Sequence, residues 1–266
     1  MLFLTGLDHA AANLLPRPES LSAGEVVRIL RQAVAEAQAR GTPAAIAVVD
    51  RVGNVLAVYQ MNGTDPAVKI NAGRAVVQPA GLAGLEVPAH AAVIAKAITG
   101  AYLSSGGNAF STRTASQIVQ ENFNPGSVGL EGGPLFGVQF SQLPCSDLSV
   151  RFESNSGGTI DPRIGPKRSP LGFSADPGGL PLYQNKTLIG GIGVIADGVY
   201  AADRTIQGRD SNLDDELIAL AGTVGFDAPS DLRADRVAVD GRSLRYADGD
   251  TGDLATGPTN AAMINL

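Results

Sequence analysis

The amino-acid sequence predicts a mixed α/β (α+β) fold, and three observations carry that prediction. An amphipathic helix that begins near Ser22 is followed at once by two apolar runs within 44–61, which is typical of an antiparallel hairpin. A second hairpin within 180–196 has a fully apolar second arm, as a strand inside a sheet would have. Further helical patterns at 89–105 and from about Ser211 supply the layers that a sheet needs on its faces.

The first helix has clear start and stop signals. Ser22 and Glu25 have the spacing of a capping box, and Gly41 with Pro43 ends the helix. The apolar positions predicted to share one face are Val26, Val27, Leu30, Ala33, Val34 and Ala37. The hairpin that follows turns at Arg51-Val52-Gly53-Asn54, where we expect the Asp50 side chain to shape the turn.

The middle of the chain is less regular. Residues 63–88 have no strong period and read as an excursion from the domain, whereas 89–105 predicts a helix rich in small residues. A shorter helix is expected over 114–123 and a strand over 132–143. Residues 144–179 hold mostly Gly, Pro, Ser, Asp and Arg, which is typical of loops.

The second hairpin turns at Gln184-Asn185-Lys186. Glycines in its second arm weaken a strand unless something approaches the backbone closely. The closing helix from Ser211 has an apolar stripe that includes Leu213, Leu217 and Leu220, and a small hairpin then turns at Asp240-Gly241.

Composition excludes several classes of function. The formal net charge is −6 with a pI near 4.9, and no basic stripe is visible, so nucleic acid is not an expected partner. No apolar run is long enough to cross a bilayer. Cys145 is the single cysteine, which excludes an internal disulfide and leaves the compartment open: cytoplasmic, or exported if an N-terminal signal has been removed. Residues 1–20 read as a tether.

Four stretches occur in an order that identifies a resemblance: "IAVVDRVGNVLAVYQM", "AKAITGA", "GGLPLYQNKTLIGGIGV" and "DDELIALAG". The chain resembles the GlcG/HbpS family, haem-binding or haem-degrading domains related to the C-terminal domain of a corrinoid adenosyltransferase. The resemblance implies a profilin-like domain, with a five-stranded antiparallel sheet and packed helices, that often assembles into homo-oligomers. It would span 21–225, with insertions at 63–88 and about 106–177, followed by a C-terminal hairpin and tail at 226–266.

Haem is the cofactor that the resemblance implies, and haem requires an apolar slot, axial ligands and cations for its propionates. His90, at a helix start, is the best candidate for the iron ligand, and the alternative is an ordinary first-turn residue of a partly exposed helix. Met61 offers a thioether ligand or fills the core. His9, His90 and Cys145 are widely separated, which disfavours a zinc site or a Cys-His pair.

Two cations and two glycines complete the candidate site. Lys96 lies in an otherwise apolar helix, where it would bind an anionic ligand group or snorkel at a subunit interface. Arg113 would clamp a carboxylate, or pair locally before a helix. Gly190 and Gly191 would allow a ligand to approach the strand closely.

Three function hypotheses follow. The first is a protein that binds haem, a related tetrapyrrole or another small ligand. The second is a structural oligomerisation module without a cofactor, which would use the small-residue helix and apolar strands. The third is an enzyme acting on a small carboxylated metabolite, with Lys96 and Arg113 as anchors.

Overall fold

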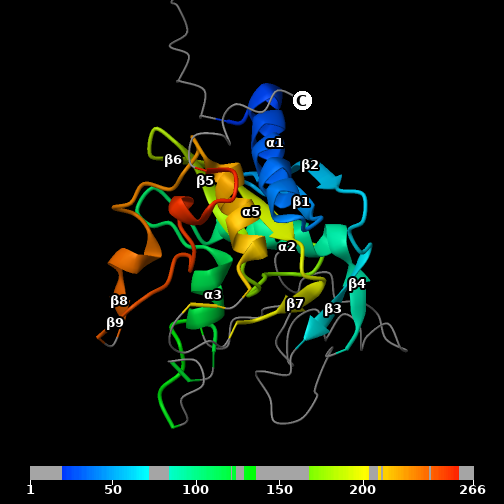
Figure 1. The fold of residues 1–266 in the computed structure, drawn as a ribbon. Coiled ribbons are helices and arrows are strands. Elements are labelled where there is room, and N and C mark those ends of the chain that lie inside the picture. Colours follow the sequence, from blue (N-terminus) through cyan, green and yellow to red (C-terminus); the bar gives the residue numbers. More distant parts are fainter. Residues whose placement is uncertain are drawn as a thin grey trace, which may run out of the picture.

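A central sheet with helices on both faces organises the molecule (Figure 1). The structure is a computed structural model that describes residues 20–71, 84–120, 122–123, 129–135, 168–203, 209–210, 212–239 and 241–257. Helices α1 (Ala23–Arg40) and α5 (Asp214–Thr223) cover one face, and α2 (Ala89–Tyr102) covers the other. The predicted α/β class is confirmed.

The central sheet joins the two predicted hairpins. Its strands, in the order β2-β1-β6-β5 and with every neighbouring pair antiparallel, are β2 (Val55–Gln60), β1 (Ala45–Asp50), β6 (Thr187–Ile195) and β5 (Gly179–Gln184). The expectation of five strands is corrected here: this sheet has four strands in the described part of the chain. The strand that follows β2 along the chain joins a different sheet.

Strand β1 shows why the apolar runs are continuous rather than alternating. Ile46 and Val48 belong to the core under α1 and α5, and Ala47 and Val49 belong to the core under α2. Because successive side chains point to opposite faces, a strand that is covered on both faces needs apolar residues at every position.

The turn chemistry predicted for the second hairpin is also confirmed. Asn185 and Lys186 have φ values of 48° and 64°, so both central residues of the β5–β6 turn are left-handed. This conformation suits the right-handed twist of the flanking strands.

Helix α1 begins at the predicted capping box, in which the Ser22 and Glu25 side chains bind each other's backbone N–H groups. It ends at Gly41, whose φ of 70° is left-handed. The predicted apolar face is wrong at one position: Val27 is 45% exposed, whereas Ile29 is fully buried.

Helix α2 lies directly against the glycines of β6. A Cβ atom at Gly191 would collide with the Ala97 carbonyl of α2, and one at Gly190 would collide with the Val49 carbonyl of β1. The close approach that these glycines predicted is therefore made by the protein's own backbone, and the small residues of α2 serve this contact.

A second, mixed sheet forms beside the first from strands β4 (Glu86–Pro88), β3 (Ala67–Asn71) and β7 (Val199–Ala201), in that order. Strands β3 and β7 are parallel. The segment 63–88, expected to be an irregular excursion, thus contributes two strands.

The described part of the C-terminal segment, 226–239 and 241–257, packs into the main core. Phe226, Leu244 and Tyr246 are buried there, and buried Glu36 of α1 accepts hydrogen bonds from the backbone N–H groups of Ala255 and Thr256 at 2.8 and 3.0 Å. The short elements of this segment are the 3₁₀ turns η1 (Ala234–Arg236) and η2 (Thr251–Asp253) and the predicted hairpin of β8 (Ala238–Val239) and β9 (Arg242–Ser243).

Other expectations are met in part. The short helix predicted over 114–123 is α3 (Thr112–Ile118). The described residues 132–135 of the predicted strand 132–143 are not in a strand, and the remainder lies outside the described residues, as do His9 and Cys145.

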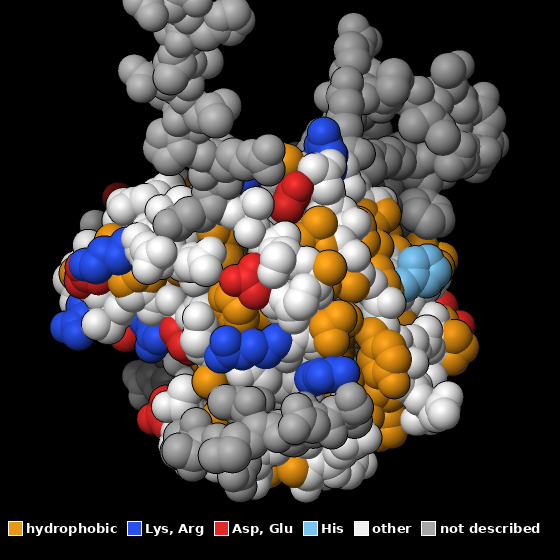
Figure 2. Space-filling model, turned by 90° about the horizontal axis from the view of Figure 1, so that it is seen from above, with side chains coloured by type: hydrophobic (Ala, Val, Ile, Leu, Met, Phe, Trp, Pro, Cys, Tyr) orange, Lys and Arg blue, Asp and Glu red, His pale blue; other side chains and the backbone are white. Residues whose placement is uncertain are grey.

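One edge of the central sheet is open. Val55, Leu56, Val58 and Tyr59 of β2 are each at least 40% exposed, and Figure 2 shows hydrophobic side chains on the side of the molecule where β2 lies. Among the helices that the structure describes, none has the length and apolarity to cross a membrane.

Gly191→Ala is expected to lower the free energy of unfolding by about 1–3 kcal/mol or more, because the added methyl group forces α2 away from β6. Urea unfolding followed by circular dichroism measures the change. Gly24→Ala is the matched control, since a Cβ there meets no atom within 4 Å. Equal stability of the two variants would contradict the close packing of α2.

Candidate functional site

Lys96 is fully buried in the middle of α2, and its Nζ is surrounded by protein oxygens. It lies 2.6 Å from the Val194 carbonyl and 2.5 Å from one carboxylate oxygen each of Asp176 and Asp215. Neither predicted role is what the structure shows: Lys96 does not reach a surface, and its bonds go to the protein's own carboxylates.

Arg113 of α3 is buried in the same way. Its Nε and Nη2 donate to the two carboxylate oxygens of Glu216 at 3.0 and 2.7 Å, and its Nη1 pairs with Asp203. Asp210 lies 3.4 Å away. The guanidinium does clamp a carboxylate, but one of this chain, and local pairing before a helix does not describe its contacts either, because Arg113 lies within α3 and its partners are distant in sequence.

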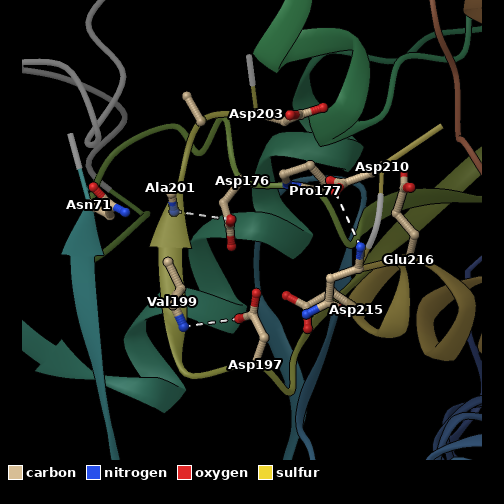
Figure 3. Close-up of a pocket in the computed structure, with 12 residues that line it drawn as sticks. Asn71, Asp176, Pro177, Asp197, Val199, Ala201, Asp203, Asp210, Asp215 and Glu216 are labelled. Carbon is tan, nitrogen blue, oxygen red and sulfur yellow. Dashed lines mark hydrogen bonds between the residues drawn. The ribbon is translucent and has the colours of Figure 1, made fainter. Parts of the chain in front are cut away.

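The first turn of α5 brings the two cations close to one cavity. Asp215 binds Lys96 and the next residue, Glu216, binds Arg113. Beside them lies a cavity of about 290 Å³, here called the acidic cavity (Figure 3). Its lining includes six carboxylates: Asp176, Asp197, Asp203, Asp210, Asp215 and Glu216. Figure 3 shows the Asp176, Asp197 and Asp215 side chains converging from three different segments.

Burial and neighbouring charges shift the pKa values of the groups around this cavity. Burial raises the pKa of Asp215 to about 7, against the lowering effect of Lys96. Burial likewise raises the pKa of Asp176 well above its usual range, and Asp215 adds to that rise. Burial lowers the pKa of Lys96, but the two aspartates outweigh it and leave the lysine charged.

The acidic cavity does not have the donor geometry of a metal site. Within the described ranges, no three His, Cys, Asp or Glu side chains are placed to hold one metal ion. Four of the carboxylates are instead in ion pairs: Asp176 and Asp215 with Lys96, and Asp203 and Glu216 with Arg113.

A second depression, here called the basic cleft, lies at the C-terminal end of α2 and has a volume of about 760 Å³. It is bordered by the β1–β2 turn, the C-terminal end of α2 and the β5–β6 turn. The lining residues are Arg51, Val52, Ala101, Tyr102, Ser104, Ser105, Gly106, Arg168, Phe173, Lys186, Thr187 and Leu188. This lining contains three cations and no carboxylate.

The cations of the basic cleft are at the surface, in contrast to Lys96 and Arg113. Arg51 and Arg168 are exposed, and Arg168 donates to the neutral side chain of Asn54. The Lys186 side chain is 67% exposed and forms an ion pair of 2.8 Å with Asp231, which is also exposed. These side chains are therefore accessible to an anion in solvent.

Two aromatic rings form the apolar part of the basic cleft. Tyr102 and Phe173 pack edge to face, with their ring centroids 6.3 Å apart. The Tyr102 hydroxyl donates to the Val52 carbonyl at 2.8 Å, which ties α2 to the β1–β2 turn.

The predicted site residues are not brought together. His90 is exposed at the start of α2, and its twelve-residue separation from Tyr102 corresponds to about 18 Å along the helix. Met61 follows β2 and packs, partly buried, against the main core. Neither residue lines the acidic cavity or the basic cleft. Gly190 and Gly191 are covered by β1 and α2, as described above.

Sequence reasoning missed the carboxylates that bind the two cations. The acidic run at 214–216 opens a helix, where negative residues are ordinary, so nothing marked Asp215 and Glu216 as partners of buried cations. The signal that was available is the presence of Lys96 in an apolar helix, since a buried charge requires a partner somewhere in the chain.

No family model matches the chain, and no curated protein matches it. Solved structures do match. A PduOC:heme complex has 17% sequence identity, covers 80% of this chain and 99% of its own, and has a TM-score of 0.45. Protein ORFY of Klebsiella pneumoniae has 16% identity, covers 80% and 95%, and has a TM-score of 0.44.

A double mutant of HbpS from Streptomyces reticuli also matches, with 17% identity, 83% and 96% coverage and a TM-score of 0.42. The TM-scores of these matches are all below 0.5.

Lys96→Ala is expected to lower the free energy of unfolding by about 3–5 kcal/mol, because it leaves Asp176 and Asp215 buried without their cation. Chemical unfolding measures the loss. Lys186→Ala, which breaks an exposed ion pair, is the matched control and should leave stability unchanged. A stable Lys96→Ala variant would show that the buried lysine is dispensable for the fold.

Proposed function

We propose that this chain binds a planar, anionic small molecule, haem or a related tetrapyrrole, in the basic cleft. One observation carries the proposal: the cleft combines three accessible cations and two aromatic rings with no carboxylate in its lining. Cations at a rim bind carboxylate groups, and aromatic side chains pack against a flat ring. The cleft volume of about 760 Å³ lies within the range of small-molecule sites.

Haem fits the cleft through its acids and its ring. Arg51, Arg168 and Lys186 would hold the propionates. Among the lining residues, Tyr102 is the side chain of a type that ligates haem iron, and bound haem would supply the redox chemistry of that iron. The acidic cavity does not fit the group, since propionates would meet six carboxylates there.

The other two hypotheses lose some of the residues on which they rested, although the exposed side chains of β2 stay available for the assembly hypothesis. The small-residue face of α2 packs inside the chain against β6, so that surface is not available for assembly. Lys96 and Arg113, the expected anchors of an enzyme for carboxylated metabolites, are bound to the chain's own carboxylates.

Titration with haemin, followed by the Soret band, should show saturable one-to-one binding. Arg51→Glu combined with Arg168→Glu should weaken it about tenfold or more, because two ion contacts become repulsive. Arg242→Glu, a charge reversal at an exposed position outside the cleft, is the matched control. Binding that is non-saturating, or that the double reversal leaves unchanged, would contradict the proposal.

Tyr102→Phe separates binding of the ring from ligation of the iron. It should alter the Soret position of bound haemin and change the affinity for metal-free protoporphyrin by much less than the Arg51→Glu and Arg168→Glu pair, because the ring and the cations stay and the lost groups are the hydroxyl and its hydrogen bond to Val52. His90→Ala and Met61→Ala should behave as wild type. Loss of the haemin spectrum in His90→Ala would instead assign the iron to His90 and overturn the assignment to the cleft.

A further inference from the structure

The Lys96 cluster is a buried group of charges that the proposed function does not use. One ammonium lies 2.5 Å from each of two carboxylates, and the residues Lys96, Asp176 and Asp215 are 0%, 5% and 9% exposed. The two carboxylates also bind backbone: Asp215 accepts from the Ala196 N–H at 2.7 Å, and Asp176 accepts from the Ala201 N–H at 3.1 Å. The cluster thus joins α2, α5, the end of β6 and β7.

Charged groups face this cluster from every element around the acidic cavity. Asp197 comes from the β6–β7 turn, and Asp203 follows β7. Among the described residues, Asp210 and Glu216 also line the cavity, and ion pairs link these carboxylates to Arg113, Asp248 and Arg245. Arg113 is already paired with Glu216 and Asp203, so among the described residues Lys96 is the cation that pairs with Asp176 and Asp215.

We propose that Asp176 and Asp215 share one proton near neutral pH, and that this proton acts as a latch that holds the first turn of α5 against α2. One lysine neutralises one carboxylate. A second negative charge in the same buried place would face Asp197 and the other carboxylates without a cation of its own, and a neutral carboxyl group avoids that repulsion. This inference does not rest on ligand binding in the basic cleft.

The direction of the pH effect follows from the raised pKa values. In the unfolded chain an aspartate loses its proton near pH 4, whereas the Asp215 pKa in the folded chain is about 7. The folded state therefore binds more protons between these values, so the contribution of Asp215 to stability falls as the pH rises from about 4 to about 7. Carboxylates with a lowered pKa in the folded chain, such as Glu25, Glu36 and Asp248, make stability rise with pH. They do so only at pH values below the usual pKa of a carboxyl group.

The test compares wild type with Asp215→Asn and Asp176→Asn by urea unfolding from about pH 5 to about pH 8. Each Asn variant imitates the protonated member of the pair and leaves one carboxylate for Lys96. Wild-type stability should fall as the pH rises to about 7, and both variants should show a flatter profile. Asp231→Asn, at an exposed aspartate, is the control and should keep the wild-type slope.

A local readout tests the latch itself. Hydrogen-exchange protection factors of α5 amides should fall in wild type as the pH passes about 7 and stay level in Asp215→Asn. If the variants fail to fold, the infrared C=O stretch of a protonated carboxylic acid in wild type just below neutral pH decides the question. Absence of that band, or an unchanged slope in folded variants, would overturn the proposal.

Discussion

The close packing of α2 on the glycines of β6 is the constraint on which the rest of the structure depends. Because Gly191 has no side chain, the backbone of α2 lies against the strand, and the middle of the helix becomes fully enclosed. Lys96 lies in that enclosed part, so its charge must be met by carboxylates from elsewhere in the chain. The packing of α2 on β6 therefore requires that a carboxylate such as Asp215 of α5 reach the buried end of Lys96.

This arrangement separates two regions of opposite charge along one helix. Around the middle of α2, Lys96 and Arg113 are buried and paired with carboxylates, and the cavity beside them is lined by acidic side chains. At the C-terminal end of α2, the cations belong to turns and stay in solvent, and the space is basic. A buried ion pair is held in place by the cost of leaving either charge uncompensated, whereas an exposed cation remains available to a ligand. The acidic region is therefore suited to holding α2 and α5 together, and the basic region to binding an anion.

Local features were predicted well because they depend on neighbouring residues. The capping box at Ser22, the left-handed Gly41 and the turn at Asn185-Lys186 each involve groups within a few positions of one another. The strand count was not predicted, because β3 joins β7, more than one hundred residues further along the chain. Val27 was misplaced because a helical period does not decide which side of a wide apolar stripe meets the core.

The sequence by itself determined the α/β class, both main hairpins and the presence of a lysine that needed an explanation. Only the tertiary structure decided what that lysine and Arg113 bind, because Asp215 and Glu216 lie about one hundred positions away and are ordinary residues for a helix start. It also decided that His90 and Met61 lie apart from the cavities and that Arg51, Arg168 and Lys186 share one cleft. Side chains on separate loops meet through the path of the backbone, which local spacing does not encode.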